Sequence, residues 1–97
     1  MQFGRVVGSV VATQKDPSLV GLKFLVLEVL TARNEATGQH VVAVDAVGAG
    51  LDETVLYASG SSARQTQQTD KRPADAVVMA IIDSWDVEGD IIFRKEG

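Results

Sequence analysis

The fold of this 97-residue chain is decided by the stretch Val41-Val42-Ala43-Val44-Asp45-Ala46-Val47-Gly48-Ala49-Gly50 and by the run Thr54-Val55-Leu56-Tyr57-Ala58 that follows it. A dinucleotide-binding loop needs Gly-x-Gly-x-x-Gly at the start of a helix, so that helix amides meet the pyrophosphate. Here the third glycine position holds Glu53, a carboxylate where the anion would sit. The run after it is β-branched and aromatic, which predicts a strand. We therefore expect the glycine loop to join two strands and its glycines to supply positive φ or close backbone approach.

Other strands are expected on both sides of this loop. Ser62 stands three residues before Gln65, the spacing of a capping box, which predicts a helix of one or two turns. The total of five or six strands and one short helix indicates a small all-β barrel, formed by a single domain over 1–97. The further strands are predicted at Gln2 to Thr13, Lys23 to Thr31, Asp75 to Val87 and Asp90 to Arg94, with polar turns at Gln14 to Ser18, Arg33 to Gly38 and Glu88-Gly89.

Apolar residues make up 45% of the chain and stand in nearly unbroken runs. The runs Leu22 to Leu30 and Val77 to Ile82 place apolar side chains on both faces of a strand, whereas an antiparallel strand with one solvated face alternates. No long amphipathic helix separates the runs, so helices are not available to cover a parallel sheet. We therefore expect other copies of the same chain to cover the second face.

Composition excludes several classes of function. The formal charge is −4 with a sequence pI near 4.7, and the basic residues are scattered, which disfavours nucleic acid as a partner. The chain has no cysteine, which excludes disulfides, thiolate metal sites and a cysteine nucleophile. It opens with no signal-peptide pattern, and no apolar run approaches the roughly 20 residues of a membrane span. A soluble, cytoplasmic protein without membrane contact is expected.

The sequence predicts no catalytic residue, no metal site and no cofactor. His40 is the only histidine and is expected at the start of a strand, with no nucleophile or further metal ligand nearby. The aspartates are scattered over expected strands and do not establish an acid–base pair. We interpret them as structural or solvated carboxylates: Asp45, Asp75 and Asp83.

Two further groups of residues have a structural interpretation. Ser61, Ser62 and Arg64 are suited to an anion at a helix N-terminus, but a capped helix whose arginine pairs with a carboxylate of its own or a neighbouring subunit is favoured. Tyr57 and Trp85 lie among apolar residues at strand spacing, which indicates core or interface anchors.

With these residues laid out, the chain resembles the EutN/CcmL family of bacterial microcompartment proteins over nearly its whole length. The resemblance implies an OB-like small β-barrel that assembles as a homopentameric ring. It further implies a non-catalytic protein that caps the vertices of a cytoplasmic polyhedral shell, whose facets are tiled by hexameric proteins of another fold. The number five comes from the resemblance alone. The motifs that carry it are Gly4-Arg5-Val6-Val7-Gly8, Ala12-Thr13-Gln14-Lys15, Leu19-Val20-Gly21-Leu22-Lys23, Val44 to Gly50, Val55 to Arg64 and Pro73-Ala74-Asp75-Ala76.

The resemblance also yields a site hypothesis, an axial loop or narrow pore built from Gly48, Ala49, Gly50, Leu51 and Asp52. The family pattern there is Gly-x-Gly-x-Gly-Glu, so this chain departs from it at position 52. A residue other than glycine makes a positive φ less expected at that position, although aspartate tolerates it better than most. It also adds a carboxylate to a loop that would repeat around an axis.

Three alternatives to the vertex function stay open. The first is an OB-type module that binds single-stranded nucleic acid. The second is a small enzyme at a subunit interface, which would combine His40 with aspartates from different chains. The third is a generic oligomeric scaffold outside any shell.

Overall fold

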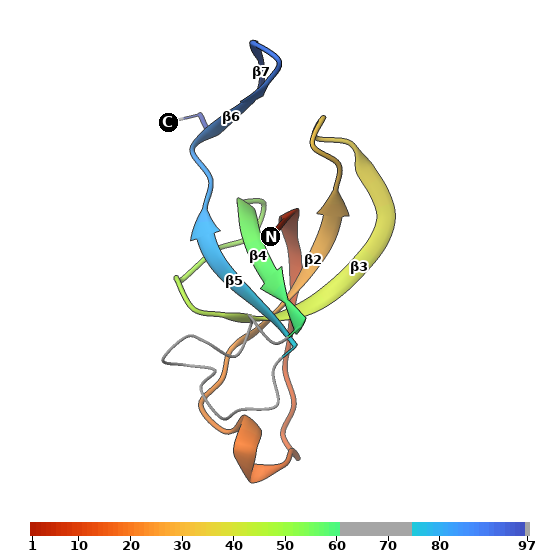
Figure 1. The fold of residues 1–97 in the computed structure, drawn as a ribbon. Helices are drawn as coiled ribbons and strands as arrows, with labels where there is room; N and C mark the ends of the chain where they lie inside the picture. Colours follow the sequence, from red (N-terminus) through yellow and green to blue (C-terminus); the bar gives the residue numbers. More distant parts are fainter. Residues whose placement is uncertain (61–74, 97) are drawn as a thin grey trace.

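The computed structural model describes residues 1–60 and 75–96. Within them five strands close a barrel in the order β1-β2-β3-β5-β4, and β6 and β7 form a separate hairpin beyond one end of it (Figure 1). The single helical element named in these ranges is the 3₁₀ turn η1 (Pro17–Leu19). The strands are β1 (Gln2–Val10), β2 (Phe24–Leu30), β3 (Ala36–Asp45), β4 (Thr54–Ser59), β5 (Ala76–Ile81), β6 (Ser84–Val87) and β7 (Asp90–Arg94).

The barrel closes through one parallel pair among antiparallel neighbours. β1 pairs with both β2 and β4, β2 pairs with β3, and β4 pairs with β5, all antiparallel. β3 and β5 run parallel, with Val44 opposite Val77 and Asp45 opposite Val78. The chain therefore leaves the end of β3 through the glycine loop, runs along β4 and returns in β5 beside β3.

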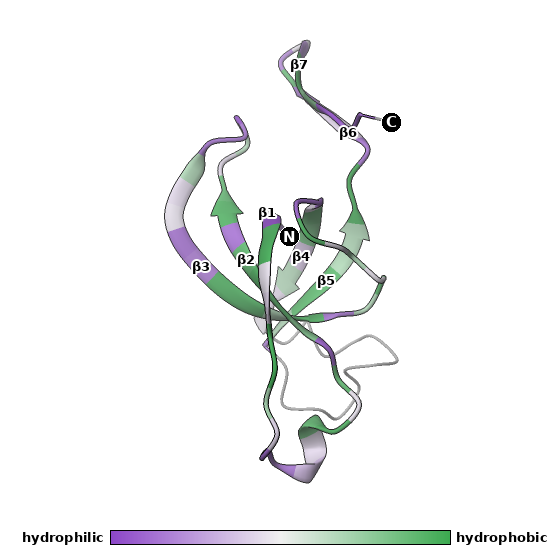
Figure 2. Ribbon diagram, turned by 180° about the vertical axis from the view of Figure 1, so that it is seen from behind, coloured by the Kyte–Doolittle hydropathy of each residue, from purple (hydrophilic) through white to green (hydrophobic). Residues whose placement is uncertain are grey.

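Alternate residues of the apolar runs fill the barrel. Leu25 and Leu27 of β2 are 3% and 0% exposed, while Phe24 and Val26, which alternate with them, are half-buried on the other face. Figure 2 shows apolar residues along the barrel strands and hydrophilic residues at the tip where β2 turns into β3. Both faces of β2 are thus apolar, as the sequence predicted, and only one of them is fully buried within the described chain.

The predicted strands are present, but their ends differ from the sequence analysis. β1 stops at Val10 rather than Thr13, because Asp16 and the proline after it start η1, where the Asp16 carboxylate accepts the Ser18 amide. β3 begins at Ala36, inside the loop predicted for Arg33 to Gly38. The reason is a tighter turn than expected, held by the Thr31 amide bonded to the Glu35 carbonyl and by the Thr31 hydroxyl.

The single long strand predicted from Asp75 to Val87 is wrong, because the chain there forms two strands, β5 and β6. The barrel itself has five strands, in agreement with the predicted five or six, and β6 and β7 lie outside it. The chain breaks at Ile82 and Asp83, where the Ile82 amide bonds to the Thr54 carbonyl of β4 and the chain then leaves the barrel. The predicted turn at Glu88 and Gly89 is confirmed. The helix predicted from Ser62 lies outside the described residues.

Candidate functional site

The glycine loop between β3 and β4 is held by a carboxylate at its start. Asp45 Oδ1 accepts the backbone N–H groups of Val47, Gly48 and Ala49 at 3.1, 3.0 and 3.2 Å. The Asp45 side chain is only 2% exposed, so its charge is directed at these amides. Asp45 is therefore a structural carboxylate that caps the loop, as the sequence analysis interpreted it.

A second carboxylate holds the other end of the loop. Glu53 Oε1 accepts the Gly50 N–H at 2.7 Å, and Glu53 Oε2 accepts a hydrogen bond from Lys95 Nζ at 2.9 Å. The bond from Lys95, and after it the bond from Gly50, lowers the pKa of Glu53, while the same carboxylate raises the pKa of Lys95. The amides that a phosphate loop offers to its ligand are thus occupied by this chain's own carboxylates.

The backbone of the loop meets one expectation and contradicts another. Gly48 has φ 79°, the positive value expected of a loop glycine. Asp52 has φ 69°, so the expectation that a residue other than glycine disfavours positive φ at this position is wrong. The Asp52 amide donates to the Val6 carbonyl at 2.8 Å, and the Val6 amide donates to the Glu53 carbonyl at 2.9 Å. These two bonds to β1 fix the turn, and aspartate tolerates the left-handed conformation better than most residues.

The side chains of the proposed axial loop point in different directions. Ala49 is 1% exposed and belongs to the barrel core, so its methyl group adds almost nothing to the exposed surface of the loop. Leu51 is 67% exposed, and Asp52 is also exposed. A contact between loops of neighbouring copies would therefore involve Leu51, Asp52 and the glycine backbone.

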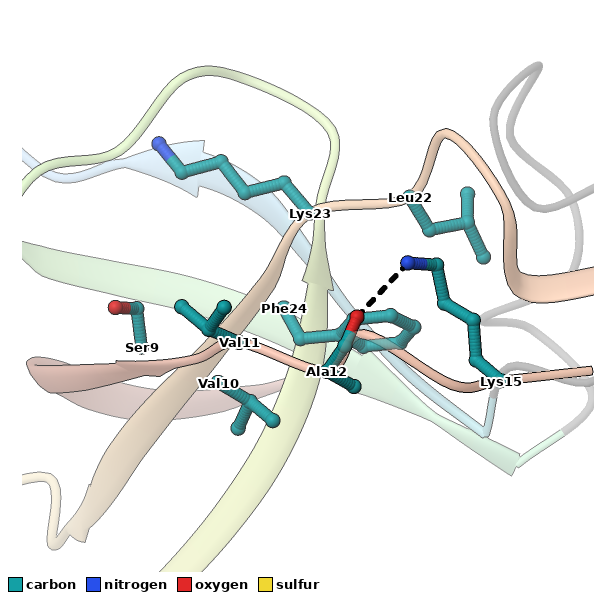
Figure 3. A pocket seen from close by; sticks show the side chains of 8 residues that line it. All are labelled: Ser9, Val10, Val11, Ala12, Lys15, Leu22, Lys23 and Phe24. Atoms are coloured by element: carbon teal, nitrogen blue, oxygen red, sulfur yellow. Dashed lines mark hydrogen bonds between the residues drawn. The ribbon is translucent and has the colours of Figure 1, made fainter.

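A hollow of about 350 Å³ lies at the opposite end of the barrel from the hairpin, where β1 runs toward η1 (Figure 3). Its walls are largely apolar, and Val11 beside it is 89% exposed. Lys15 Nζ donates to the Ala12 carbonyl at 2.9 Å. A second hollow of about 290 Å³ shares Ser9 and Lys23 with the first and extends to Ala49 and Leu51. Among the described residues that line the two hollows there is no histidine and no carboxylate for acid–base chemistry.

The residues considered for catalysis are not brought into an active site. His40 is exposed within β3, opposite Glu28 of β2, and does not begin the strand as expected. The carbonyl groups of Asp75 and Asp83, both exposed residues, accept backbone bonds from Gly60 and Lys95.

Residues 1–60 and 75–96 contain no group of three or more histidines, aspartates or glutamates placed to hold a metal ion. They also contain no helix with the length and apolar character needed to cross a membrane. Ser61, Ser62 and Arg64 lie outside these ranges.

Of the two predicted aromatic anchors, Tyr57 is confirmed as a core residue, whereas Trp85 is half-buried in the hairpin outside the barrel core. Tyr57 of β4 is 2% exposed in the core, burial raises its pKa, and its hydroxyl donates to Gln2 Oε1. Trp85 stacks between Phe3 of β1 and Phe93 of β7, with ring centroids 4.3 and 5.2 Å apart.

Lys95 was not predicted from the sequence as a partner of the glycine loop. Lys95 is separated from Glu53 by 42 positions and lies after the last strand. No local pattern connects two such residues. The charge of Glu53 was the only available signal that a cation would approach the loop.

Comparisons with known proteins agree over nearly the full length. Residues 1–83 match the family model described as ethanolamine utilisation protein EutN/carboxysome. The carboxysome shell vertex protein CcmL of Gloeobacter violaceus is 50% identical over 99% of this chain and 96% of its own. The bacterial microcompartment shell vertex protein EutN of Salmonella typhimurium is 38% identical over 98% of this chain and 96% of its own.

Solved structures give the same result. The structure of Gloeobacter violaceus CcmL has a TM-score of 0.94 at 50% identity and covers 98% of each chain. The GrpN pentameric microcompartment shell protein from Rhodospirillum rubrum has a TM-score of 0.82 at 42% identity and covers 90% of this chain and 99% of its own.

Proposed function

The chain belongs to the ethanolamine utilisation protein EutN/carboxysome family, and we propose that it is a structural protein that forms homopentamers at the vertices of a bacterial microcompartment shell in the cytoplasm. The observation that carries the proposal is the 50% identity, over almost the whole of both chains, to a protein named as a shell vertex protein. The pentameric description of a relative with a TM-score of 0.82 supports the number of subunits.

A vertex protein acts through its shape. Flat layers of hexagons do not close, so a five-fold unit is needed at each corner of a polyhedral shell. Such a unit requires a rigid protomer, a face for its neighbours in the ring, and a rim that fits the hexameric tiles. Closed rings use two different surfaces of each subunit. The rigid part is the closed barrel, whose strand edges are paired with one another.

Exposed apolar residues are available for contacts between subunits. Val11 is 89% exposed and borders the first hollow, and Leu51 is 67% exposed and borders the second. The two hollows share Ser9 and Lys23 in their linings, and their surface is mainly apolar. Apolar surface of this kind on a small protomer favours burial against another copy.

We assign no reaction to the protein. The carboxylates of Asp45 and Glu53 are bonded to loop amides, and His40 is exposed on a strand away from any described acid–base pair. The single-stranded nucleic acid alternative is disfavoured by the net charge of −4. The hexameric shell proteins at the rim are the proposed partners.

Native mass spectrometry of the purified chain tests the oligomeric state. We expect a pentamer, and a population of dimers, trimers or hexamers would contradict the proposal. Deletion of the gene tests the vertex position in the cell. We expect shells that fail to close into polyhedra, so sealed, faceted compartments in the deletion strain would contradict a vertex function even if the protein is pentameric.

A further inference from the structure

We propose that the C-terminal segment is a strap that sets the shape of the glycine loop: the β6–β7 hairpin returns Lys95 to the barrel, and Lys95 holds Glu53, which holds Gly50. Glu53 and Lys95 are then positioning residues for the loop. The strap itself is a property of the protomer. Only its relevance to the ring, through a loop near the axis, rests on the proposed function.

The hairpin begins at the point where the chain leaves the barrel. The Ile82 amide donates to the carbonyl of Thr54, the first residue of β4, at 2.9 Å. Glu53 directly precedes Thr54 in the chain, so the hairpin begins beside Glu53. The Lys95 amide donates to the Asp83 carbonyl at 2.7 Å and so extends the ladder of the hairpin by one more pair. The register of β6 and β7 therefore returns Lys95 to the place where the hairpin began.

Side-chain contacts fix the hairpin to the barrel. A two-stranded hairpin alone is only marginally stable in water. This one is anchored by Trp85, whose ring stacks on Phe3 and whose Nε1 donates to the Ala32 carbonyl at 2.8 Å. Arg33 at the tip between β2 and β3 lies 3.5 Å from Glu88 and 3.6 Å from Asp90. These contacts join the hairpin to the end of the barrel where β2 turns into β3, the end nearest the hairpin in Figure 1.

Both oxygens of the Glu53 carboxylate accept a hydrogen bond. Glu53 Oε2 accepts from Lys95 Nζ, and Glu53 Oε1 accepts from the Gly50 amide. Hydrogen bonds with an ionised partner are stronger than neutral ones. The Glu53 side chain is 25% exposed and that of Lys95 is 44% exposed, so solvent screens the pair without removing it. The carboxylate thus transmits the position of the hairpin to the loop backbone.

The pH dependence of this contact follows from the two shifts. The pKa of Glu53 is lowered, so its contribution is present at neutral pH and is lost as the pH falls through the lowered value. The pKa of Lys95 is raised, so its contribution is lost only as the pH rises through the raised value. Asp83 is the other charged group acting on Lys95, and it also favours the ammonium form. The strap is therefore closed across the neutral range and opens in acid, as the pH falls through the lowered pKa of Glu53.

A double-mutant cycle on the full chain tests the strap through the hydrogen exchange of the Gly50 amide, measured by NMR. Lys95→Met and Glu53→Gln should each raise that exchange rate about threefold, and the double variant should raise it no further than the larger single effect. Lys95→Arg keeps the charge and should restore the rate of the unaltered chain. The matched control is Glu28→Gln, which removes the 2.8 Å Arg5–Glu28 pair on the barrel surface and should leave Gly50 unchanged.

Two outcomes would overturn the inference. The first is an unchanged Gly50 rate in Lys95→Met, which would mean that the hairpin does not act on the loop. The second is an equal rise at the buried amide of Leu27, which would mean a loss of global stability. Neither outcome depends on the oligomeric state. A monomer in native mass spectrometry would count against the vertex proposal and leave the measurement at Gly50 valid.

Discussion

At the scale of single residues, Gly4 in β1 is where the barrel leaves no room for a side chain. A Cβ added at Gly4 would lie 3.2 and 3.3 Å from ring carbons of Tyr57 and 3.4 Å from the Glu28 carbonyl oxygen. Tyr57 is buried and bonded to Gln2, so its ring cannot easily move away. We expect Gly4→Ala to lower the free energy of unfolding by about 1–3 kcal/mol, measured by urea denaturation.

The matched control for this prediction is Gly8→Ala in the same strand. A Cβ added there would lie 3.8 Å from the nearest atom, Val26 Cβ, which is an ordinary contact. We expect a change within about 1 kcal/mol. Equal losses in the two variants would show that strand glycines matter for a reason other than the approach of Tyr57.

The glycine loop illustrates how far single residues were predictable. The prediction that the Glu53 carboxylate occupies the place of a bound anion is confirmed. It could be made because the spacing of Glu53 from the glycines is visible in the local sequence. The φ of Asp52 was not predictable, because bonds to Val6 of β1 impose it. Lys95 was not predictable either, because its approach depends on the register of a hairpin formed after the barrel.

At the scale of elements, the C-terminal hairpin is the part that sequence reasoning described least well. An apolar run from Val77 to Ile82 followed by Trp85 and Val87 looks like one continuous strand. The break after Ile81 is caused by a tertiary bond, from the Ile82 amide to β4, which has no counterpart in the local pattern. The central strands were predicted more accurately because β-branched runs and turn residues mark them directly.

The stack of Trp85 on Phe3 provides a measurable signal for docking of the hairpin. Trp85 is the only tryptophan of the chain, and its ring lies between Phe3 and Phe93. We expect Phe3→Ala to shift the tryptophan emission to longer wavelength and to destabilise docking by roughly 1–2 kcal/mol. The far-ultraviolet circular dichroism of the barrel should be retained.

The control for the stack is Ile91→Ala on β7. Ile91 is 61% exposed and is paired with Asp86 and not with Trp85 in the hairpin, so the emission should stay as in the unaltered chain. An unshifted emission in Phe3→Ala would contradict docking through this stack.

At the scale of the whole molecule, the barrel was predictable and its closure was not. The tally of strands indicated a barrel, but the parallel pairing of β3 with β5 joins strands that are not consecutive. The second apolar face of β2 agrees with the expectation of self-association, since Phe24 and Val26 are only half-buried in the single chain. A ring of five is set by the angle between neighbouring subunits. That angle depends on two complementary surfaces and leaves no periodic mark in one sequence.

The position of the glycine loop in the proposed ring can be tested through the charge of Asp52. Copies of this exposed carboxylate would repel one another if the loops meet around an axis. Asp52→Asn removes the charge and keeps a residue that tolerates positive φ. We therefore expect the variant to lower the concentration at which pentamers dissociate by about twofold to tenfold at low salt, and less at physiological salt, where charges are screened.

The measurement is analytical ultracentrifugation over a dilution series, and Asp86→Asn is its matched control. Asp86 is an exposed aspartate of β6, so its replacement changes the net charge of the protomer by the same amount. A long-range effect of net charge would act equally in both variants, because it depends on the total and not on position. A larger effect at Asp52 would thus place the loop near the symmetry axis. Equal effects would contradict a position of the loop at the axis. The pentameric state would then still be tested separately, by native mass spectrometry.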